Sequence, residues 1–213
     1  MTETLSPRDR LLETASRLFY SEGIHTVGVD KLVTAAGVTR ATFYRHFPTK
    51  EDLVVAYLRA QHAQIRAGVE SAARTEPNGD AALAVLDFVG DSTCGAGFRG
   101  CPFINAAAEY SDPENPVRVV VTEHRAWFHD ALLDLVTQAG HPDPEYAAAA
   151  LVLLRDGALQ GGELDDPEQV KATLRRASRQ VLVSVGGGLV TPPPPPTPPN
   201  EPAVGGAGPG GAR

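Results

Sequence analysis

Three short runs of apolar residues, each closed by a glycine or a proline, constrain the start of this chain more than any other feature. Apolar residues at helical spacing end before Gly23, recur over residues 29–36 before Gly37, and recur again over residues 39–47 before Pro48. Glycine ends helices because it adopts left-handed backbone conformations without strain, and proline cannot continue a helix. The spacing therefore predicts three helices joined by tight turns.

Two polar residues predict where the flanking helices begin. Ser6 precedes Pro7, which is the order of an N-cap followed by proline at the first helical position. Thr49 can cap a long fourth helix that runs from Lys50 to about Arg74. The first part of the chain is therefore predicted to be helical almost throughout.

The two short helices and the turn between them predict a helix-turn-helix, the motif that places its second helix in the major groove of DNA. Phe43 and Phe47 mark the buried side of this second helix, and Ala41 and Arg45 lie on the opposite side. The formal net charge of the protein is −7, yet residues 30–50 carry four basic residues and one acid. A basic segment in an acidic protein indicates a localised contact with nucleic acid.

The side chains of this second helix suit different DNA contacts. Arg45 or Arg40 can donate two hydrogen bonds to a guanine, and the small residues at the start of the helix let its backbone approach the groove. Tyr44, His46 and Lys50 flank that face and suit phosphate contacts, which fix the register without reading the sequence. The predicted DNA-contacting residues are Thr39, Arg40, Ala41, Thr42, Tyr44, Arg45, His46 and Lys50.

A basic, aromatic helix by itself is often only a solvated face, but here the whole surrounding pattern is specific. The segment GIHTVGVDKLVTAAGVTRATFYRHFPTKEDLV resembles the DNA-binding domain of TetR-family transcriptional regulators. One departure is Gly28, where the family usually has a threonine or serine cap, so a side-chain phosphate contact is lost there. The matching positions are Leu32, Ala35, Ala36, Gly37, Val38, Thr39, Thr42, Phe43, Tyr44, His46, Phe47, Lys50, Glu51 and Leu53.

The resemblance implies a fold and a way of working. It implies an all-α protein in which a three-helix DNA-binding domain is joined by a long helix to a helical ligand-binding and dimerisation domain. It further implies a homodimer that binds a palindromic operator in double-stranded DNA and responds to a small-molecule effector. A cytoplasmic location is expected because the N-terminal residues lack the basic-then-apolar order of a signal peptide. A repressor released by its ligand is the first expectation, and a ligand-independent activator is an alternative.

The rest of the chain also favours an all-α fold, since no segment alternates like a strand. Helices are predicted over residues 81–91, 104–110, 114–139, 145–160 and 167–185. From residue 186 onward the chain is dominated by proline and glycine, which predicts a disordered tail. The predicted domains are residues 6–66 (helix-turn-helix 29–48), residues 67–185 and the tail 186–213.

Two features of the second domain predict its roles. The last two helices carry more apolar surface than a monomer can bury, so they are predicted to form the dimer interface, with Leu151 or Leu154 on it. The stretch FRGCPFINAAAEY resembles a segment of an actinobacterial-type subgroup of the family. Aromatic and polar residues around this stretch and the following helix predict a ligand pocket. Its predicted members are Phe98, Phe103, Asn105, Glu109, Tyr110, His124, Trp127 and Phe128.

Other chemistry finds little support in the sequence. Residues 95–100, GAGFRG, fit a dinucleotide fingerprint literally, so a nucleotide-dependent enzyme is the runner-up, although a helical run rather than a strand precedes them. Cys94 and Cys101 could form a reversible disulfide, but packing of Cys101 as a small hydrophobe is favoured. His124 and His129 lie five residues apart, off the spacing of helical metal pairs. No metal, cofactor or membrane association is expected.

Overall fold

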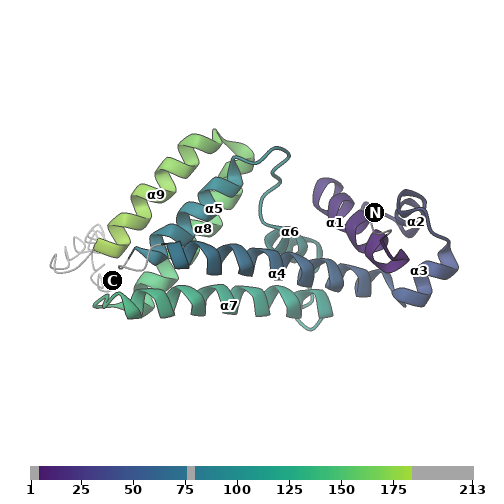
Figure 1. The fold of residues 1–213 in the computed structure, drawn as a ribbon, viewed down its shortest axis with the longest axis horizontal. Helices are drawn as coiled ribbons and strands as arrows, with labels where there is room; N and C mark the ends of the chain where they lie inside the picture. Colours follow the sequence, from purple (N-terminus) through teal and green to yellow (C-terminus); the bar gives the residue numbers. More distant parts are fainter. Residues whose placement is uncertain (1–4, 76–79, 184–213) are drawn as a thin grey trace, which may run out of the picture.

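The computed structural model describes residues 5–75 and 80–183, so the predicted tail lies outside the described residues. Within these ranges the chain forms nine α-helices and no strand, which confirms the all-α prediction (Figure 1). The helices are α1 (Pro7–Glu22), α2 (Val29–Ala36), α3 (Arg40–His46), α4 (Lys50–Thr75), α5 (Ala81–Thr93), α6 (Pro102–Glu109), α7 (Pro116–Gln138), α8 (Pro144–Leu164) and α9 (Pro167–Val183).

The ends of the first three helices follow from local side-chain chemistry. The Ser6 hydroxyl accepts a hydrogen bond from the backbone amide of Asp9 at 3.2 Å, and the Thr39 hydroxyl accepts one from the amide of Thr42 at 3.1 Å. Each bond satisfies an amide that has no partner within its own helix. Gly37 ends α2 with φ at 61°, in the left-handed region that other residues avoid. This turn sets the angle between α2 and α3.

Helices α1, α2 and α3 pack around one small core at one end of an elongated molecule (Figure 1). Leu11, Leu32 and Phe43, one from each helix, are 0% exposed. Burying each such side chain stabilises the fold by about 1.5–3 kcal/mol. Arg10 of α1 adds a polar link, because its Nε donates to the carbonyl of Ala36 at the end of α2 at 3.1 Å. This bond fixes α1 to the C-terminal end of α2.

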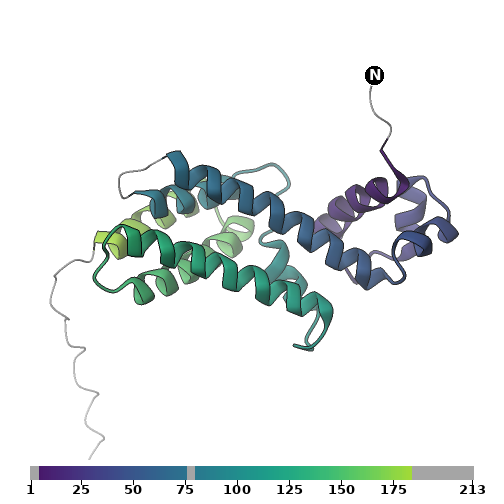
Figure 2. The same ribbon diagram turned by 60° about the horizontal axis from the view of Figure 1, so that its bottom comes forward.

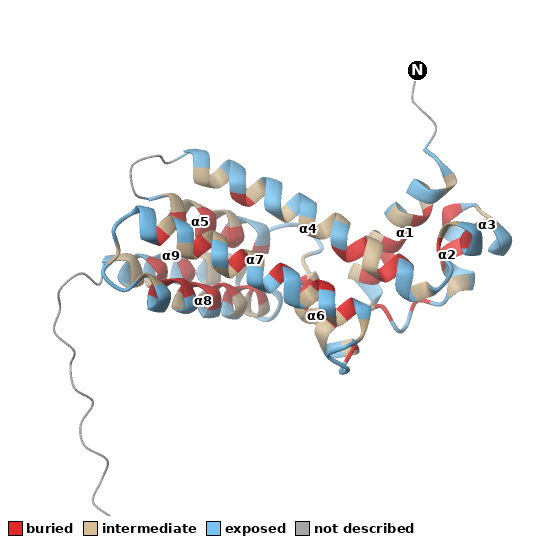
Figure 3. Ribbon diagram, turned by 90° about the horizontal axis from the view of Figure 1, so that it is seen from below, coloured by how far each residue is buried: buried red, intermediate tan, exposed pale blue. Residues whose placement is uncertain are grey.

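Helix α4 runs from this end of the molecule into the other, with α7 alongside it (Figure 2). Leu53 and Tyr57, in its first turns, are buried against the N-terminal helices. Much of its second half is exposed, whereas α8 is buried along most of one side (Figure 3). Helix α5 packs against α4, α8 and α9, and α6 sits between the two ends of the molecule. No helix in the described ranges is both long and apolar enough to cross a bilayer.

Two predictions about α8 need correction. The helix continues to Leu164 rather than ending at residue 160. Gly162 in this added turn allows close packing, since a side chain there would come within 2.6 Å of Thr93 Cβ on α5. Leu151 is 0% exposed and belongs to the core, so its predicted place on a dimer interface is wrong. Leu153, two positions further along, is instead 69% exposed, because two residues along a helix turn the side chain by about 200°, to the opposite side.

Candidate DNA-binding surface and ligand cavity

Helix α3 presents its basic residues to solvent. Phe43 is buried, and Arg40, Ala41, Tyr44 and Arg45 are all exposed. The Tyr44 ring is 48% exposed and rests edge-on against Phe43, with ring centres 5.1 Å apart. Thr39 and Thr42 begin the helix, and their hydroxyls lie 3.0 Å apart. One face of α3 thus combines two guanidiniums, an aromatic hydroxyl and small side chains.

The two arginines of α3 differ in their surroundings. Arg40 is held by Asp30 of α2 through two hydrogen bonds of 2.6 and 2.7 Å, and this pairing lowers the pKa of Asp30. Arg45 has no ion-pair partner among the described residues, so its full charge faces solvent. Arg45 is the better placed of the two for a base contact.

The other two basic residues of the predicted set turn away from this face. His46 is half-buried, and its Nε2 is enclosed without a hydrogen-bond partner among the described residues. Lys50 is also half-buried, and its ammonium lies 5.9 Å from the centre of the Phe19 ring. Burial lowers the pKa of Lys50, an effect that the carboxylate of Glu109 opposes. Both side chains are thus less exposed than Arg40 and Arg45.

A cavity of about 340 Å³ lies between α4, α5, α7, α8 and the loop that joins α5 to α6. We call it the loop cavity. Its wall is mostly apolar, with the rings of Phe88, Phe98 and Phe128, and includes Tyr20 of α1 and Gln61 and Ile65 of α4. Pockets of this size and polarity commonly hold small organic ligands.

Arg155 of α8 separates the loop cavity from a second space, the α7–α8 groove, and lines both. Its guanidinium is 4.9 Å from the centre of the Phe128 ring and within 3.5 Å of His124 Nε2. His124 stacks flat on Phe103, with ring centres 3.6 Å apart, and its Nδ1 lies 3.0 Å from His62 Nδ1. Burial, with help from Arg155 and His62, lowers the pKa of His124 to about 3. His124 is therefore neutral at physiological pH.

The predicted ligand residues do not share one cavity. Phe98 and Phe128 line the loop cavity, Phe103 and His124 line the α7–α8 groove, and Asn105 and Glu109 line a cleft between α1 and α6. The Trp127 ring packs against His62 with ring centres 4.9 Å apart. Tyr110 is buried against His25, with ring centres 4.9 Å apart, and burial raises its pKa to about 12.

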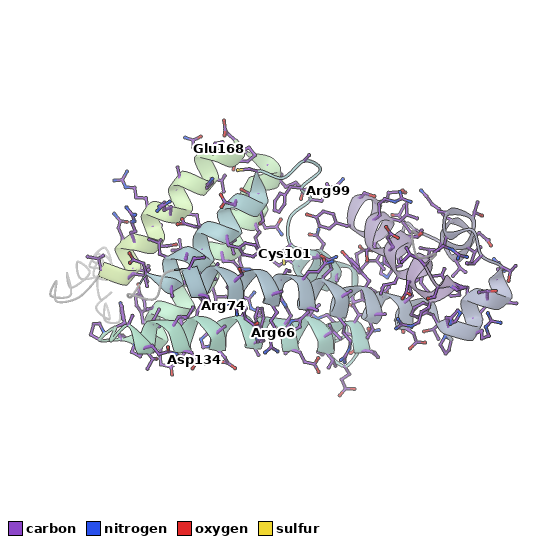
Figure 4. All side chains as sticks on the ribbon, in the orientation of Figure 1. Arg66, Arg74, Arg99, Cys101, Asp134 and Glu168 are labelled. Atoms are coloured by element: carbon purple, nitrogen blue, oxygen red, sulfur yellow. The ribbon has the colours of Figure 1, made fainter. Side chains whose placement is uncertain are left out.

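The contacts between α1 and the α5–α6 loop join the two ends of the molecule. Tyr20 Oη donates to the carbonyl of Gly100 at 3.0 Å and accepts from the amide of Arg99 at 2.8 Å. The Arg99 guanidinium also donates to the carbonyl of Ser21 at 3.3 Å and pairs with Glu163 at 2.9 Å. Figure 4 shows Arg99 and Cys101 on the segment that leads into α6. The same loop thus lines the cavity and holds α1.

Comparison with known proteins identifies the whole architecture. Residues 11–57 match the profile of the family described as bacterial regulatory proteins, tetR family. The structure of SCO4454, a TetR-family transcriptional regulator from Streptomyces coelicolor, is 47% identical and superposes with a TM-score of 0.80. That match covers 83% of this chain and 94% of the other. This protein belongs to the TetR family. It is accordingly a DNA-binding transcriptional regulator.

Two more distant proteins, one a solved structure and one compared by sequence alone, are also similar to this chain. A putative TetR-family regulator from Streptomyces avermitilis is 27% identical, with a TM-score of 0.69 over 82% of this chain and 99% of that one. The transcriptional activator FasR from Mycolicibacterium smegmatis is 28% identical over 136 residues, which is 62% of this chain. The match spans 59% of the length of FasR.

Within this TetR-family chain, the GAGFRG loop lacks the setting of a dinucleotide site. Helix α5 precedes it where the fingerprint needs a strand, and α6 begins only at Pro102. Its backbone instead bonds to Tyr20. Cys94 is exposed and Cys101 is buried, and both are free thiols. No cluster of three or more metal-ligating side chains occurs in the part of the chain that the structure describes.

Sequence reasoning missed two residues of this TetR-family site, Tyr20 and Arg155. The role of Tyr20 could not be predicted from its neighbours in the sequence, because its hydrogen-bond partners lie about 80 positions away. Arg155 gave a weak signal: it stands with Asp156 inside an otherwise apolar helix, where burying a charge needs a compensating group. A charged residue on the buried face of a helix therefore indicates a candidate site residue.

Proposed function

We propose that this regulator is a homodimeric, cytoplasmic repressor that leaves a palindromic operator when a small molecule enters the loop cavity. The observation that carries the proposal is the shared loop: residues 95–98, 100 and 101 line the cavity, and the backbone of Arg99 and Gly100 bonds to Tyr20 of α1. A ligand that moves this loop must also move α1 or break its bonds to it. We further propose that residues 6–66 bind DNA and residues 67–185 bind the ligand and dimerise.

In the proposed complex, α3 enters the major groove. Arg45 donates hydrogen bonds to a base, and Tyr44 contacts a phosphate. Arg40, which stays paired with Asp30, adds positive charge beside Arg45. Thr39, Ala41 and Thr42 lie close to the groove, and His46 and Lys50 contact phosphate only if they turn outward. The two α3 helices of a dimer must sit about 34–36 Å apart to enter successive major grooves.

The proposed dimer forms through α8 and α9. Tyr146, Leu153 and Leu164, all on α8, are 63%, 69% and 80% exposed. A groove of about 500 Å³ between α8 and α9 continues this surface and is lined by small residues such as Gly157 and Gly161. Exposed leucines beside small residues suit close packing of helices from two copies, related by a two-fold axis.

Switching requires a modest energy difference between two states. The ligand must bind the state that does not fit DNA more tightly, and a hundredfold loss of operator affinity needs only about 2.7 kcal/mol of coupling. The loop cavity touches α4 at Gln61 and Ile65 as well as α1 at Tyr20. Both helices lead to the DNA-binding end, so a small rearrangement at the cavity would change the separation of the two α3 helices.

A gel shift against DNA flanking the protein's own gene, repeated with candidate small molecules, tests this function. A specific complex that dissociates with one of the compounds is the expected result. Absence of any specific complex with flanking or genomic DNA contradicts the proposal. Activation is a second candidate, since the relative FasR is named a transcriptional activator. A reporter gene under the operator, measured with and without the regulator gene, separates the two.

A further inference from the structure

The wall of the loop cavity contains one charged residue, and that residue is almost completely buried. Arg155 is 5% exposed, and no aspartate, glutamate or lysine is among the residues that line the cavity. The rest of the wall is dominated by aromatic and aliphatic side chains and by the glycines of the α5–α6 loop. Removing a guanidinium from water is costly unless a negative charge compensates it.

The compensation within the protein is incomplete because Asp156 is shared. Arg155 Nη1 lies 2.9 Å from one oxygen of the Asp156 carboxylate, and Arg125 Nη1 lies 2.6 Å from the other. Asp156 is the only carboxylate paired with Arg155 in the described ranges. Two guanidiniums on one carboxylate leave this three-residue cluster, to which Arg155 belongs, with a net charge of +1.

The remaining contacts of the Arg155 guanidinium supply no negative charge. Its Nη2 lies 3.4 Å from the thiol sulfur of Cys101 and 3.5 Å from His124 Nε2. A thiol sulfur is a weak acceptor, and His124 is neutral because burial lowers its pKa to about 3. The Nε of Arg155 is buried and has no hydrogen-bond partner among the described residues.

The surroundings on the other side of Arg155 have the same sign. The α7–α8 groove is lined by Arg118 and Arg125 in addition to Arg155, and no aspartate or glutamate lines it. The residues that line the α7–α8 groove therefore supply no negative charge to compensate Arg155. A cationic ligand would be repelled from the loop cavity.

We propose that the loop cavity binds an organic anion, with an apolar body against Phe88, Phe98 and Phe128 and a carboxylate or similar acidic group at Arg155. The planar guanidinium matches the two oxygens of such a group. A cavity of about 340 Å³ accommodates a molecule with up to about three rings or a medium-length chain. This proposal rests on the proposed function in treating the cavity as the effector site.

Two fluorescent probes that differ by one charged group test the proposal without knowledge of the effector. 8-Anilinonaphthalene-1-sulfonate carries a sulfonate, and N-phenyl-1-naphthylamine is its neutral counterpart. In the full-length protein, Arg155→Met should weaken the sulfonate probe by about ten- to a hundredfold and leave the neutral probe unchanged. Energy transfer from Trp127, the single tryptophan, reports that the probe is bound nearby, since its ring centre is 6.0 Å from that of Phe128.

Two further variants protect the test against a folding defect. Asp156→Asn removes a negative charge from the cluster, so this variant should bind the sulfonate probe more tightly than wild type does. The affinity for the neutral probe should stay the same. Unfolding cannot produce this combination of results. Arg66→Met removes a surface arginine of α4, labelled in Figure 4, whose side chain is 55% exposed and paired with Glu70. It should bind both probes like wild type.

The outcomes divide cleanly. Equal effects of Arg155→Met on both probes, or no effect on either, overturn the anion site. If Arg155→Met loses its helical circular dichroism, Asp156→Asn decides, and unchanged affinity for the sulfonate probe overturns the proposal. Operator binding is measured on the same proteins. If the protein binds its operator but Arg155→Met does not distinguish the sulfonate probe from the neutral probe, only the anion site is contradicted. If the wild-type protein binds no operator, the proposed function is contradicted.

Discussion

The carboxylate of Glu109, in the last turn of α6, accepts hydrogen bonds from the backbone amides of Ile24 at 2.8 Å and His25 at 2.5 Å. Ile24 and His25 lie in the turn between α1 and α2, so Glu109 joins the three N-terminal helices to α6. The sequence predicted Glu109 in a ligand pocket, but in the structure both of its carboxylate oxygens accept hydrogen bonds from the backbone of the α1–α2 turn. The junction of the two ends is therefore polar and specific.

We predict that Glu109→Gln destabilises this junction. The amide side chain loses the charge and one of the two acceptor oxygens, which should lower the free energy of unfolding by about 1–2 kcal/mol. Urea unfolding followed by circular dichroism measures the change. Glu114→Gln, an exposed carboxylate just after α6, is the matched control and should be neutral. Equal stability of Glu109→Gln and wild type would mean that these bonds are not maintained in solution.

Tyr20→Phe should weaken the link between cavity and DNA without preventing DNA binding. The substitution removes only the hydroxyl that bonds to Gly100 and Arg99. Ligand-free operator affinity should stay within about threefold of wild type, while the ligand-induced loss of affinity should shrink by about tenfold, or 1.4 kcal/mol of coupling. Operator titrations with and without the effector measure both quantities. Full retention of the ligand effect would place the coupling in α4 alone.

Arg45→Ala and Arg40→Ala should affect DNA binding differently. Arg45 is unpaired among the described residues, and its loss should cost about 1–3 kcal/mol per half-site and relax the preference at one base pair. Arg40 already bonds to Asp30, so its removal should change sequence preference less. Selection from a randomised operator library measures the preference. An unchanged preference in Arg45→Ala would show that another residue reads the base.

Leu153→Glu should split the dimer. This side chain is 69% exposed on α8, so a carboxylate there is harmless in the monomer and is desolvated only when a second copy packs against it. Light scattering at micromolar concentration should give the monomer mass, and tight operator binding should be lost. Val119→Glu on α7, where the side chain is 43% exposed, is the control and should remain dimeric. A dimeric Leu153→Glu would exclude this surface as the interface.

Stability should fall in mild acid because of His124. Burial lowers its pKa to about 3 in the folded protein, against 6.5 in the unfolded chain, so the unfolded state binds the proton first as pH falls. The loss begins near pH 6.5 and reaches about 2 kcal/mol at pH 5. His124→Gln should show a smaller loss between pH 7 and pH 5 in urea unfolding, and His129→Gln on the same helix should match wild type. Parallel curves for His124→Gln and wild type would contradict this.

The sequence by itself determined the helices and the motif. Ser6, Thr39 and Gly37 act within one turn of their own positions, and the spacing of Phe43 and Phe47 depends only on helical geometry. Local rules of this kind can be read without knowing what packs where. The all-α fold and the helix-turn-helix followed from them, whereas the family followed from the resemblance of the motif segment to known regulators.

Only the tertiary structure decided which side chains meet across the molecule. Tyr20 meets Gly100, Glu109 meets Ile24, and Arg155 meets His124, pairs separated by 80, 85 and 31 positions. Six of the eight predicted ligand residues were divided among three spaces for the same reason, and Tyr110 and Trp127 line none of the three. Periodicity shows that a face is buried but not which neighbour buries it, because that depends on the angles at which whole helices pack.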